Sequence, residues 1–562
     1  MSSVSIGPLL TRASRGHALW RPGVWDAGVL GIALILALPV LTVTGFVFYP
    51  AGEVWAHLAD TVLKGYIVNS LALMLGVAAG TLLLGVSTAW VCSTCRFPGR
   101  PVFEWALLLP LAMPAYIIAY TYTGMLDFAG PLQTRLRAWT GWQYGDYWFP
   151  EIRSLGGAIA MLSLVLYPYV YLLARAAFLD QSVCALETAR SLGLSAAAAF
   201  RRVVLPMARP AIVAGVSLAL METLADYGAV QYFGVSTFTT GIFRTWFGLG
   251  DSAAAAQLAA ILMVFVFVLI ALERRSRKQA RFHHTSQRYR PLPRFKLTGI
   301  RAAGAWAVCV TPLLFGFLVP AGQLTFWSIQ TADRMVDAEF LELAANSIGL
   351  AATAAVCVLL LALVMAYGKR MRGTRPVRFA VTLAGMGYAI PGVVVAIGVI
   401  IPFAWLDNAI DAGMRATFGV STGLLLSGTL FALIFAYSVR FLAVSLHAVE
   451  AGLGKINPAM DDAARSLGRP PGAVLREIHV PIMRGTLLTA LLLVFVDVMK
   501  ELPATLIMRP FDFNTLAVRA FELASDERLA DSASAAVTIV LTGIVPVILL
   551  SRSITRSRPG YA

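Results

Sequence analysis

The sequence carries little charge for its length, because only 13% of its 562 residues are Asp, Glu, Lys or Arg, against 58% hydrophobic residues. Charged side chains make up roughly a quarter of an ordinary soluble domain, so a soluble fold is excluded. The five cysteines lack the spacing of a disulfide framework or a zinc finger. The net charge of +15 does not indicate nucleic-acid binding, because the basic residues lie in short loops between apolar runs.

The chain also lacks the motifs of common catalytic sites. Gly454-Lys455 is followed by Ile456, so it is not the Gly-x4-Gly-Lys-[Ser/Thr] loop that holds nucleotide phosphates. The apolar spans contain no His/Glu metal cluster and no nucleophile motif. The neighbouring His283 and His284 would make a weak metal site on their own. We therefore expect no catalytic residue and no cofactor on this chain, and we leave open whether it holds a metal.

Apolar segments of the length needed to cross a bilayer, about 20 residues, occur six times in each half of the sequence. They lie near 27–48, 66–92, 102–123, 155–178, 210–232 and 252–272, and near 302–327, 343–367, 378–404, 423–446, 485–508 and 532–551. This pattern predicts an all-α polytopic membrane protein. The basic loops fall on one side of the spans, which the positive-inside rule makes cytoplasmic. We expect both termini on that side of a bacterial inner membrane.

A stretch of 20 residues occurs twice without a gap, 275 positions apart, as 187–206 and 462–481. A repeat of fixed period indicates two related structural units. In the two copies Glu187 aligns with Asp462, Ala189 with Ala464, Gly193 with Gly468 and Pro206 with Pro481. Outside them, Met113-Pro114 aligns with Ile390-Pro391. Because six spans per half is an even number, the halves should be parallel repeats: 1–272 and 301–562, joined by a basic cytoplasmic linker at 273–300.

The repeated stretch resembles the cytoplasmic EAA loop in the membrane subunits of ATP-binding cassette (ABC) importers. Each copy has an acidic residue, then Ala, Gly and a final Pro at the spacing of that loop. The resemblance implies that each loop holds a short coupling helix, which docks into a groove on an ATPase subunit. Gly193 and Gly468 can take the positive φ that ends such a helix. Two loops on one chain imply two ATPase copies, which would bind the ATP.

Ionisable residues inside the predicted spans are the other candidate site, since buried charges in a membrane are costly and are usually functional. They repeat at the same period as the loops: Glu222 matches Asp497, and Asp226 matches Glu501. The i, i+4 spacing predicts that both carboxylates of each pair share one helical face, with Lys500 as their partner. Pro503 should break the helix just past these charges. Two interpretations stay open: a structural ion-pair network, or the lining or gate of a translocation path.

The residues around these charges indicate which ABC importer subunits the chain resembles most specifically. The stretch 497–509, DVMKELPATLIMR, and the stretch 221–228, METLADYG, are similar to the fused permeases of ferric-iron importers. That similarity implies transport of ferric iron delivered by a periplasmic binding protein. The second loop departs from the family pattern, with Asp462 for Glu and Val480-Pro481 for Leu-Pro. Fused permeases for thiamine and phosphonates share the architecture and remain alternatives, as does an ion-gradient-driven secondary transporter with parallel six-span halves.

Overall fold

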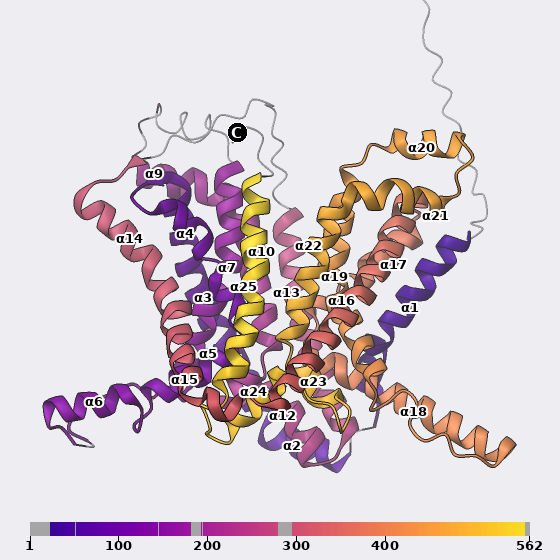
Figure 1. Cartoon of the computed structure of the whole chain (residues 1–562), viewed down its shortest axis with the longest axis horizontal. Coiled ribbons are helices and arrows are strands. Elements are labelled where there is room, and N and C mark those ends of the chain that lie inside the picture. The colour runs from indigo at the N-terminus through magenta and orange to yellow at the C-terminus, as the bar shows by residue number, and fades with distance from the viewer. Residues whose placement is uncertain are drawn as a thin grey trace, which may run out of the picture.

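The computed structural model describes residues 23–50, 52–143, 145–180, 191, 193, 195–278 and 295–556. The chain forms one helical bundle, with long helices running between two ends and shorter helices gathered at each end (Figure 1). Helix α20 (Pro458–Ser466) marks one end, while α6 (Pro131–Thr140) and the end of α18 (Gly392–Phe418) project from the other (Figure 1). The predicted all-α polytopic class is therefore confirmed.

The described helices divide at the linker into an earlier and a later set. The earlier helices are α1 (Val24–Gly45), α2 (Glu53–Thr61), α3 (Leu63–Thr94), α4 (Arg100–Ala106), α5 (Ala115–Leu126), α6, α7 (Leu155–Asp180), α9 (Ala196–Ala199), α10 (Leu205–Ala225), α11 (Gly228–Tyr232), α12 (Phe238–Phe243) and α13 (Ser252–Lys278). The later helices are α14 (Gly299–Leu313), α15 (Val319–Met335), α16 (Ala338–Arg372), α17 (Arg375–Ala384), α18, α19 (Leu430–Gly454), α20, α21 (Pro471–Val474), α22 (Val480–Met499), α23 (Pro503–Met508), α24 (Leu516–Ser525) and α25 (Ala533–Arg556).

Membrane-spanning helices account for most of this bundle. Among the described residues, ten helices are long and apolar enough to cross a membrane, or eleven if the pair Arg100–Ala112 and Ala115–Thr140, bent by 90°, counts as one span. Each of the twelve predicted spans overlaps helical structure among the described residues. The third, fifth, ninth and eleventh contain breaks, however, and the apolar part of the last, Ala533–Ile548, is shorter than the others. The protein is thus a multi-pass membrane protein.

Each half has a core of three long helices that pack in the same way. In the first half α3 packs on α7 and α10, and in the second α16 packs on α19 and α22. Glycines let α3 approach α7 closely, because a Cβ on Gly80 would lie 2.2 Å from the Ser163 hydroxyl oxygen and one on Gly85 would lie 2.6 Å from Val170. Small residues at such contacts are how helices associate in a membrane, where water exclusion contributes little.

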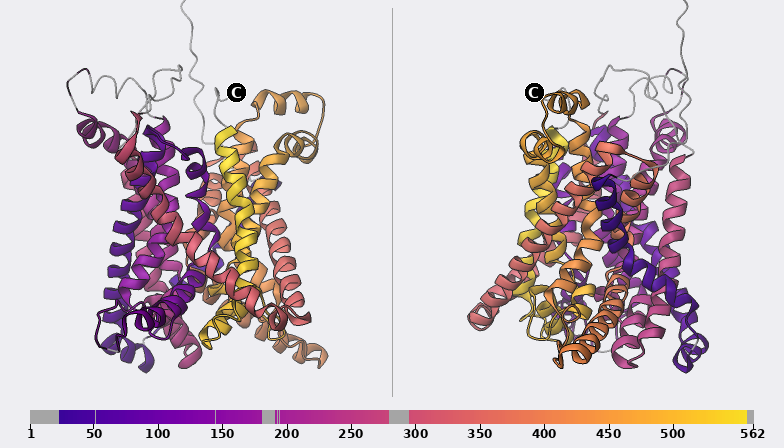
Figure 2. Two further views of the ribbon diagram at one scale, coloured as in Figure 1. Left: turned by 60° about the vertical axis from the view of Figure 1, so that its left-hand side comes forward. Right: turned by 90° about the vertical axis from the view of Figure 1, so that its right-hand side faces the viewer.

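The first helix of each half packs against the opposite half. Helix α1 contacts α16, α17 and α18 of the second half, while α14 contacts α3 and α15 contacts α5 of the first half. An ion pair between Asp26 of α1 and Arg372 of α16, 3.2 Å apart, links α1 to the second half. The packing of α1 on the opposite half is called the exchange of α1 below. A two-residue parallel pairing of β1 (Cys95–Arg96) with β2 (Phe295–Lys296) joins the chain after the linker to the end of α3. In the left view of Figure 2 most of the earlier helices, indigo to magenta, lie on one side and most of the later ones, orange to yellow, on the other. The predicted division at 273–300 stays a prediction.

Candidate translocation cavity and coupling loops

Two matching breaks interrupt the third and ninth predicted spans. In each, a helix (α4 or α17) is followed by a 3₁₀ turn, an extended residue and a proline that starts the next helix. Pro114 precedes α5 with φ −58° and ψ 142°, and Pro391 precedes α18 with φ −54° and ψ 141°. Proline cannot donate a hydrogen bond to the preceding turn and disfavours helix at the residue before it. The two prolines that align in the sequence therefore lie at matching breaks in the structure.

A second pair of breaks lies at the intramembrane carboxylates. Helix α10 ends at Ala225, and Asp226 is extended, with ψ 132°. One Asp226 oxygen accepts hydrogen bonds from the N–H groups of Ala229 and Val230, each 3.1 Å long. Glu501 does the same for the following helix, accepting from Ala504 N at 3.2 Å and Thr505 N at 3.1 Å. Each acid therefore caps the next short helix, α11 or α23, and satisfies its first N–H groups.

These breaks correct two predictions. The carboxylates of each pair do not share a helical face, because the helix ends between Glu222 and Asp226, and again between Asp497 and Glu501. The predicted position of the second break was also wrong. It covers residues 500–502, at the charges themselves, and Pro503 begins α23 instead of ending α22. Proline is well suited to a first helical position, where the missing N–H has no intrahelical partner.

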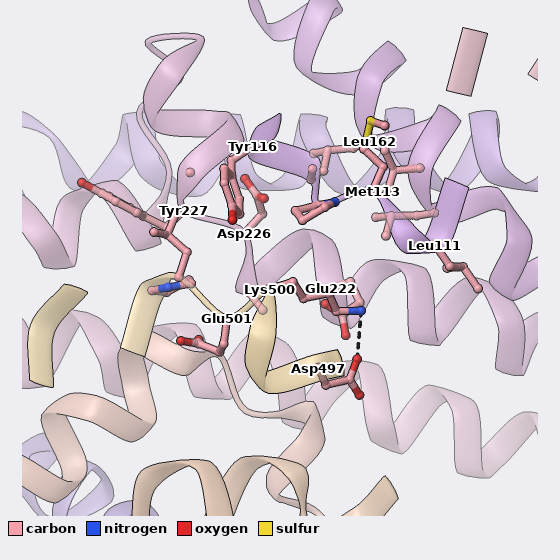
Figure 3. A pocket seen from close by; sticks show the side chains of 18 of the residues that line it. Leu111, Met113, Tyr116, Leu162, Glu222, Asp226, Tyr227, Asp497, Lys500 and Glu501 are labelled. Carbon is pink, nitrogen blue, oxygen red and sulfur yellow. Dashed lines mark ion pairs between the residues drawn. The ribbon is translucent and has the colours of Figure 1, made fainter. Parts of the chain in front are cut away.

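The four breaks surround a cavity of about 110 Å³, enough for several water molecules. Its wall comes from both halves and includes all five predicted path residues: Glu222, Asp226, Asp497, Lys500 and Glu501. Figure 3 shows these side chains around the cavity, together with Tyr116 and Tyr227. The structure thus brings together residues that lie far apart in the sequence. Their role in translocation stays a prediction.

Ion pairs neutralise the two carboxylates of the second half. The Lys500 amino group lies 2.9 Å from Asp497 Oδ1, as expected. Glu501 pairs instead with Arg440 of α19, at 2.5 Å, and both side chains are almost fully buried. Sequence reasoning missed Arg440, although an arginine within the apolar span 430–454 was a sufficient signal. A buried carboxylate needs such a partner, since an unpaired charge in the interior is strongly destabilising.

Tyrosines from the two halves also meet in the cavity wall. The hydroxyl oxygens of Tyr169, on α7, and Tyr388, in the 3₁₀ turn before Pro391, lie 3.4 Å apart. Nothing in the sequence marked either residue, because their meeting depends on how the halves pack.

Among the residues that the structure describes, no three His, Cys, Asp or Glu side chains are placed to hold a metal ion.

The second coupling loop contains the predicted short helix. Helix α20 starts after Asn457, whose side chain caps it, and includes both Asp462 and Ala464. Ala464 is buried and Asp462 is exposed. Gly468 has the predicted positive φ, 76°, and Pro481 lies in the first turn of α22. Met460 and Leu467 are also exposed, so α20 presents a partly apolar outer face.

Buried polar contacts hold α20 to the membrane helices. Asp461 accepts from Arg370 Nε of α16 at 2.8 Å and from His479 Nε2 at 2.7 Å. Arg370 also donates to the carbonyl oxygens of Leu453 and Ile456, just before α20. Burial would raise the pKa of Asp461, but the hydrogen bonds from Arg370 and His479 outweigh it and hold that pKa below its ordinary value. The carboxylate therefore anchors α20 as a charged group at neutral pH.

Much of the first coupling loop lies outside the described residues, including Glu187 and Ala189. Gly193 is described and has φ 81°, which matches Gly468 and the prediction. Pro206 lies in the first turn of α10, as Pro481 does in α22. A π-helical turn precedes both helices, at Phe200–Val204 and at Leu475–His479. The repeat is therefore visible in helix geometry as well as in sequence.

The comparisons with known proteins agree with the motifs, although no family model matches the chain. The Fe(3+)-transport system permease protein FbpB 2 of Haemophilus influenzae is 27% identical over 555 residues, covering 95% of this chain and 99% of that protein. The molybdenum transport system permease protein ModB of Escherichia coli is 26% identical over 39% of this chain and 96% of its own length. A chain of a bacterial alginate ABC transporter crystal structure aligns with 16% identity and a TM-score of 0.36, covering 46% of this chain and 98% of its own. The predicted resemblance to ferric-iron permeases is confirmed over nearly the whole chain.

Proposed function

Because this chain is similar over nearly its whole length to ferric-iron permeases, we propose that it is the translocation subunit of an ATP-driven importer for ferric iron. One observation carries the proposal. Helix α22 begins next to the second coupling loop and ends at the cavity, where it supplies Asp497. Its 20 residues cover about 30 Å at the rise of an α-helix. A displacement of the loop therefore reaches the cavity through one continuous helix.

The same connection exists in the first half, where α10 (Leu205–Ala225) has Pro206 in its first turn and ends at the break at Asp226. ATP-driven closure of two ATPase subunits would move both coupling helices together. The pull along α10 and α22 would change the breaks that enclose the cavity, which is a shift between two states of the bundle. The exposed face of α20 is the expected contact for one ATPase subunit, and the first loop for the other.

The charges of the cavity favour a cation as cargo. Its wall contains four carboxylates against one lysine and one arginine, so an oxyanion such as molybdate or a phosphonate would be repelled. A hard trivalent cation prefers oxygen ligands, which the carboxylates supply. Thiamine, itself a cation, remains the alternative cargo. We propose that a periplasmic binding protein delivers the iron and that this chain works in a bacterial inner membrane with both termini cytoplasmic.

In this proposal the chain itself carries out no chemical step. ATP would bind to the partner subunits, and the chain itself would need no resident cofactor. Its contribution is to hold the cavity between the halves and to convert movement of the coupling loops into a change of that cavity. Proline bends and capped half-helices suit that task, because backbone groups freed by a break inside a membrane must be satisfied by neighbouring protein groups or a water-filled cavity.

Reconstituted vesicles test the proposal directly. The chain is purified with its ATPase subunits and reconstituted, and the soluble binding protein is added. Uptake of radiolabelled ferric iron is followed with and without ATP on the side of the membrane that the ATPase subunits face. Uptake that requires ATP and the binding protein is the expected result. Iron uptake driven by an imposed ion gradient without ATP would replace the proposal with the secondary transporter, and uptake of thiamine but not iron would change the cargo.

A further inference from the structure

The charges in the cavity are unequal between the halves, although the scaffold around them repeats. Both basic residues, Arg440 and Lys500, come from the second half. The repeat period of 275 places Val165 and Ala225 at the matching positions of the first half, and both line the same cavity. The carboxylates repeat, whereas the cations that neutralise them do not.

This difference leaves the first-half carboxylates with excess negative charge. Arg440 is paired with Glu501 and Lys500 with Asp497. In Figure 3 Lys500 also lies near Glu222, but one amino group supplies only one positive charge. In the described part of the chain neither Glu222 nor Asp226 forms an ion pair of its own. Asp226 accepts only backbone N–H groups, which do not cancel a full charge.

A tyrosine adds an oxygen donor to the same cavity. The Tyr116 side chain is 5% exposed, lines the cavity and has no hydrogen-bond partner for its hydroxyl group. Figure 3 shows the ring with its hydroxyl end directed into the cavity. The residue is held in place by Gly228, where an added Cβ would lie 2.6 Å from the Tyr116 Cβ. The matching residue in the second half is Val393, 277 positions later, so this phenol has no counterpart at the repeat-related position, and Tyr388, the second-half tyrosine in the wall, has its hydroxyl group next to that of Tyr169.

A buried hydroxyl group without a partner is costly, and so is a carboxylate without a counter-ion. Both costs disappear when a cation enters, because carboxylate and phenol oxygens are the ligands that hard cations prefer. The cavity has room for a cation with some of its water. The second half offers neither a free carboxylate nor a phenol at the matching places.

We propose that Glu222, Asp226 and Tyr116 form a one-sided transit site for a hard cation, whereas Asp497 and Glu501 are fixed in structural ion pairs. The inference rests on the proposed function, because it names where the cargo of that importer is held in passage. The described residues contain no chelating cluster of three acidic, histidine or cysteine side chains. The site therefore attracts the cation by charge and holds it weakly, which passage requires.

Isosteric substitutions separate the two kinds of carboxylate. Glu222→Gln with Asp226→Asn removes both excess charges, and ATP-dependent uptake of radiolabelled ferric iron in vesicles should fall by about tenfold or more. Lys500→Met with Asp497→Asn also removes two charged groups, but one is positive and one is negative, so the net charge of the cavity is kept. Its uptake should stay at least about threefold above that of the first variant. Equal uptake by the two double variants, or wild-type uptake by the first, overturns the inference.

A second pair of variants covers the case in which the first does not fold. Ala225→Lys supplies the cation that the first half lacks, and Ala225→Met is a neutral control of similar length. Uptake should be lower with lysine than with methionine by about tenfold, and the same uptake in both refutes the charge argument. Size-exclusion profiles and thermal stability in detergent are measured for each variant.

Binding of Tb³⁺ keeps this inference separate from the proposed function. Tb³⁺ is a hard trivalent cation whose luminescence is excited through nearby aromatic rings. The purified wild-type chain should give a brighter Tb³⁺ signal than the Glu222→Gln, Asp226→Asn variant, and Tyr116→Phe should weaken it. No iron uptake by wild type would overturn the proposed function alone. Equal Tb³⁺ signals in wild type and the double variant would overturn the transit site alone.

Discussion

Replacing Asp461 with asparagine tests whether the second coupling helix is held rigidly to the membrane helices. The side chain keeps its shape but loses its charge, and it can no longer accept from Arg370 and His479 together. The substitution thus weakens the contact between α20 and α16 without touching the outer face of α20. If that contact transmits force, ATP hydrolysis should continue while iron uptake falls.

The size of the effect follows from the contacts that are lost. His479 is fully buried, and Asp461 is 8% exposed, so a lost hydrogen bond is not replaced by water. A hydrogen bond to a charged group contributes about 1.5–3 kcal/mol. Asparagine retains one acceptor oxygen, so we expect a loss of about 2 kcal/mol in the free energy of unfolding. Asp461→Leu, which leaves both donors unpaired, should cost about 3–5 kcal/mol.

Because the folded-state pKa of Asp461 is lowered, its contribution is fully present above the unfolded-state pKa of about 4 and is lost as pH falls through the lower, folded-state value. The deficit of Asp461→Asn should therefore be fully present at neutral pH and shrink only in strong acid. Unfolding in detergent by increasing SDS measures the free energy, and vesicles give the iron imported per ATP hydrolysed. We expect that ratio to fall about threefold or more, as for loss of a coupling contact.

Asp462→Asn is the matched control on the same helix. Asp462 is exposed, and its nearest basic group, on Arg465, is 3.8 Å away, so its loss should change stability by less than about 1 kcal/mol. The reasoning is refuted if Asp461→Asn is as stable as wild type, or if it is unstable yet imports the normal amount of iron per ATP.

Three other substitutions probe the loops and the cavity. Gly468→Pro should block ATPase association while the protein still inserts, because proline cannot adopt φ 76°; pull-down of the ATPase subunit from membranes decides this. Asp462→Lys should lower substrate-stimulated ATP hydrolysis in vesicles, since charge reversal at an interface costs up to several kcal/mol; unchanged hydrolysis argues against docking there. Gly392→Ala should lower thermal stability, because its Cβ would lie 2.2 Å from Arg440 Nη1 and 2.6 Å from Glu501 Oε1; a variant as stable as wild type would show that the ion pair can shift freely.

The sequence was sufficient for features that depend on local chemistry. Glycine at 193 and 468 marks two turns with positive φ, and the alignment of Pro114 with Pro391 places two prolines that have nearly the same backbone angles. Apolar length predicted the spans, and the period of 275 predicted which residues would lie at matching places. These predictions work because each depends on a few neighbouring residues.

The sequence was insufficient where helices end against each other. The i, i+4 spacing of Glu222 and Asp226 suggests a shared face only if the helix continues, and the aspartate ends it by capping α11. The partner of Glu501 is Arg440, 61 residues away on another helix. The exchange of α1 between halves has no local signal either, because it is decided by packing between distant spans.

That exchange has a consequence for how the chain is made. Helix α1 leaves the ribosome before its packing partners α16, α17 and α18, which follow roughly 300 residues and on the order of tens of seconds later. Through that interval Asp26 lacks Arg372, its ion-pair partner in the finished fold. Helix α14, in contrast, finds α3 already in place. The packing of α1 should therefore be one of the last steps of assembly. A nascent chain stopped before α18 would leave α1 exposed to the membrane proteases that remove unfinished proteins.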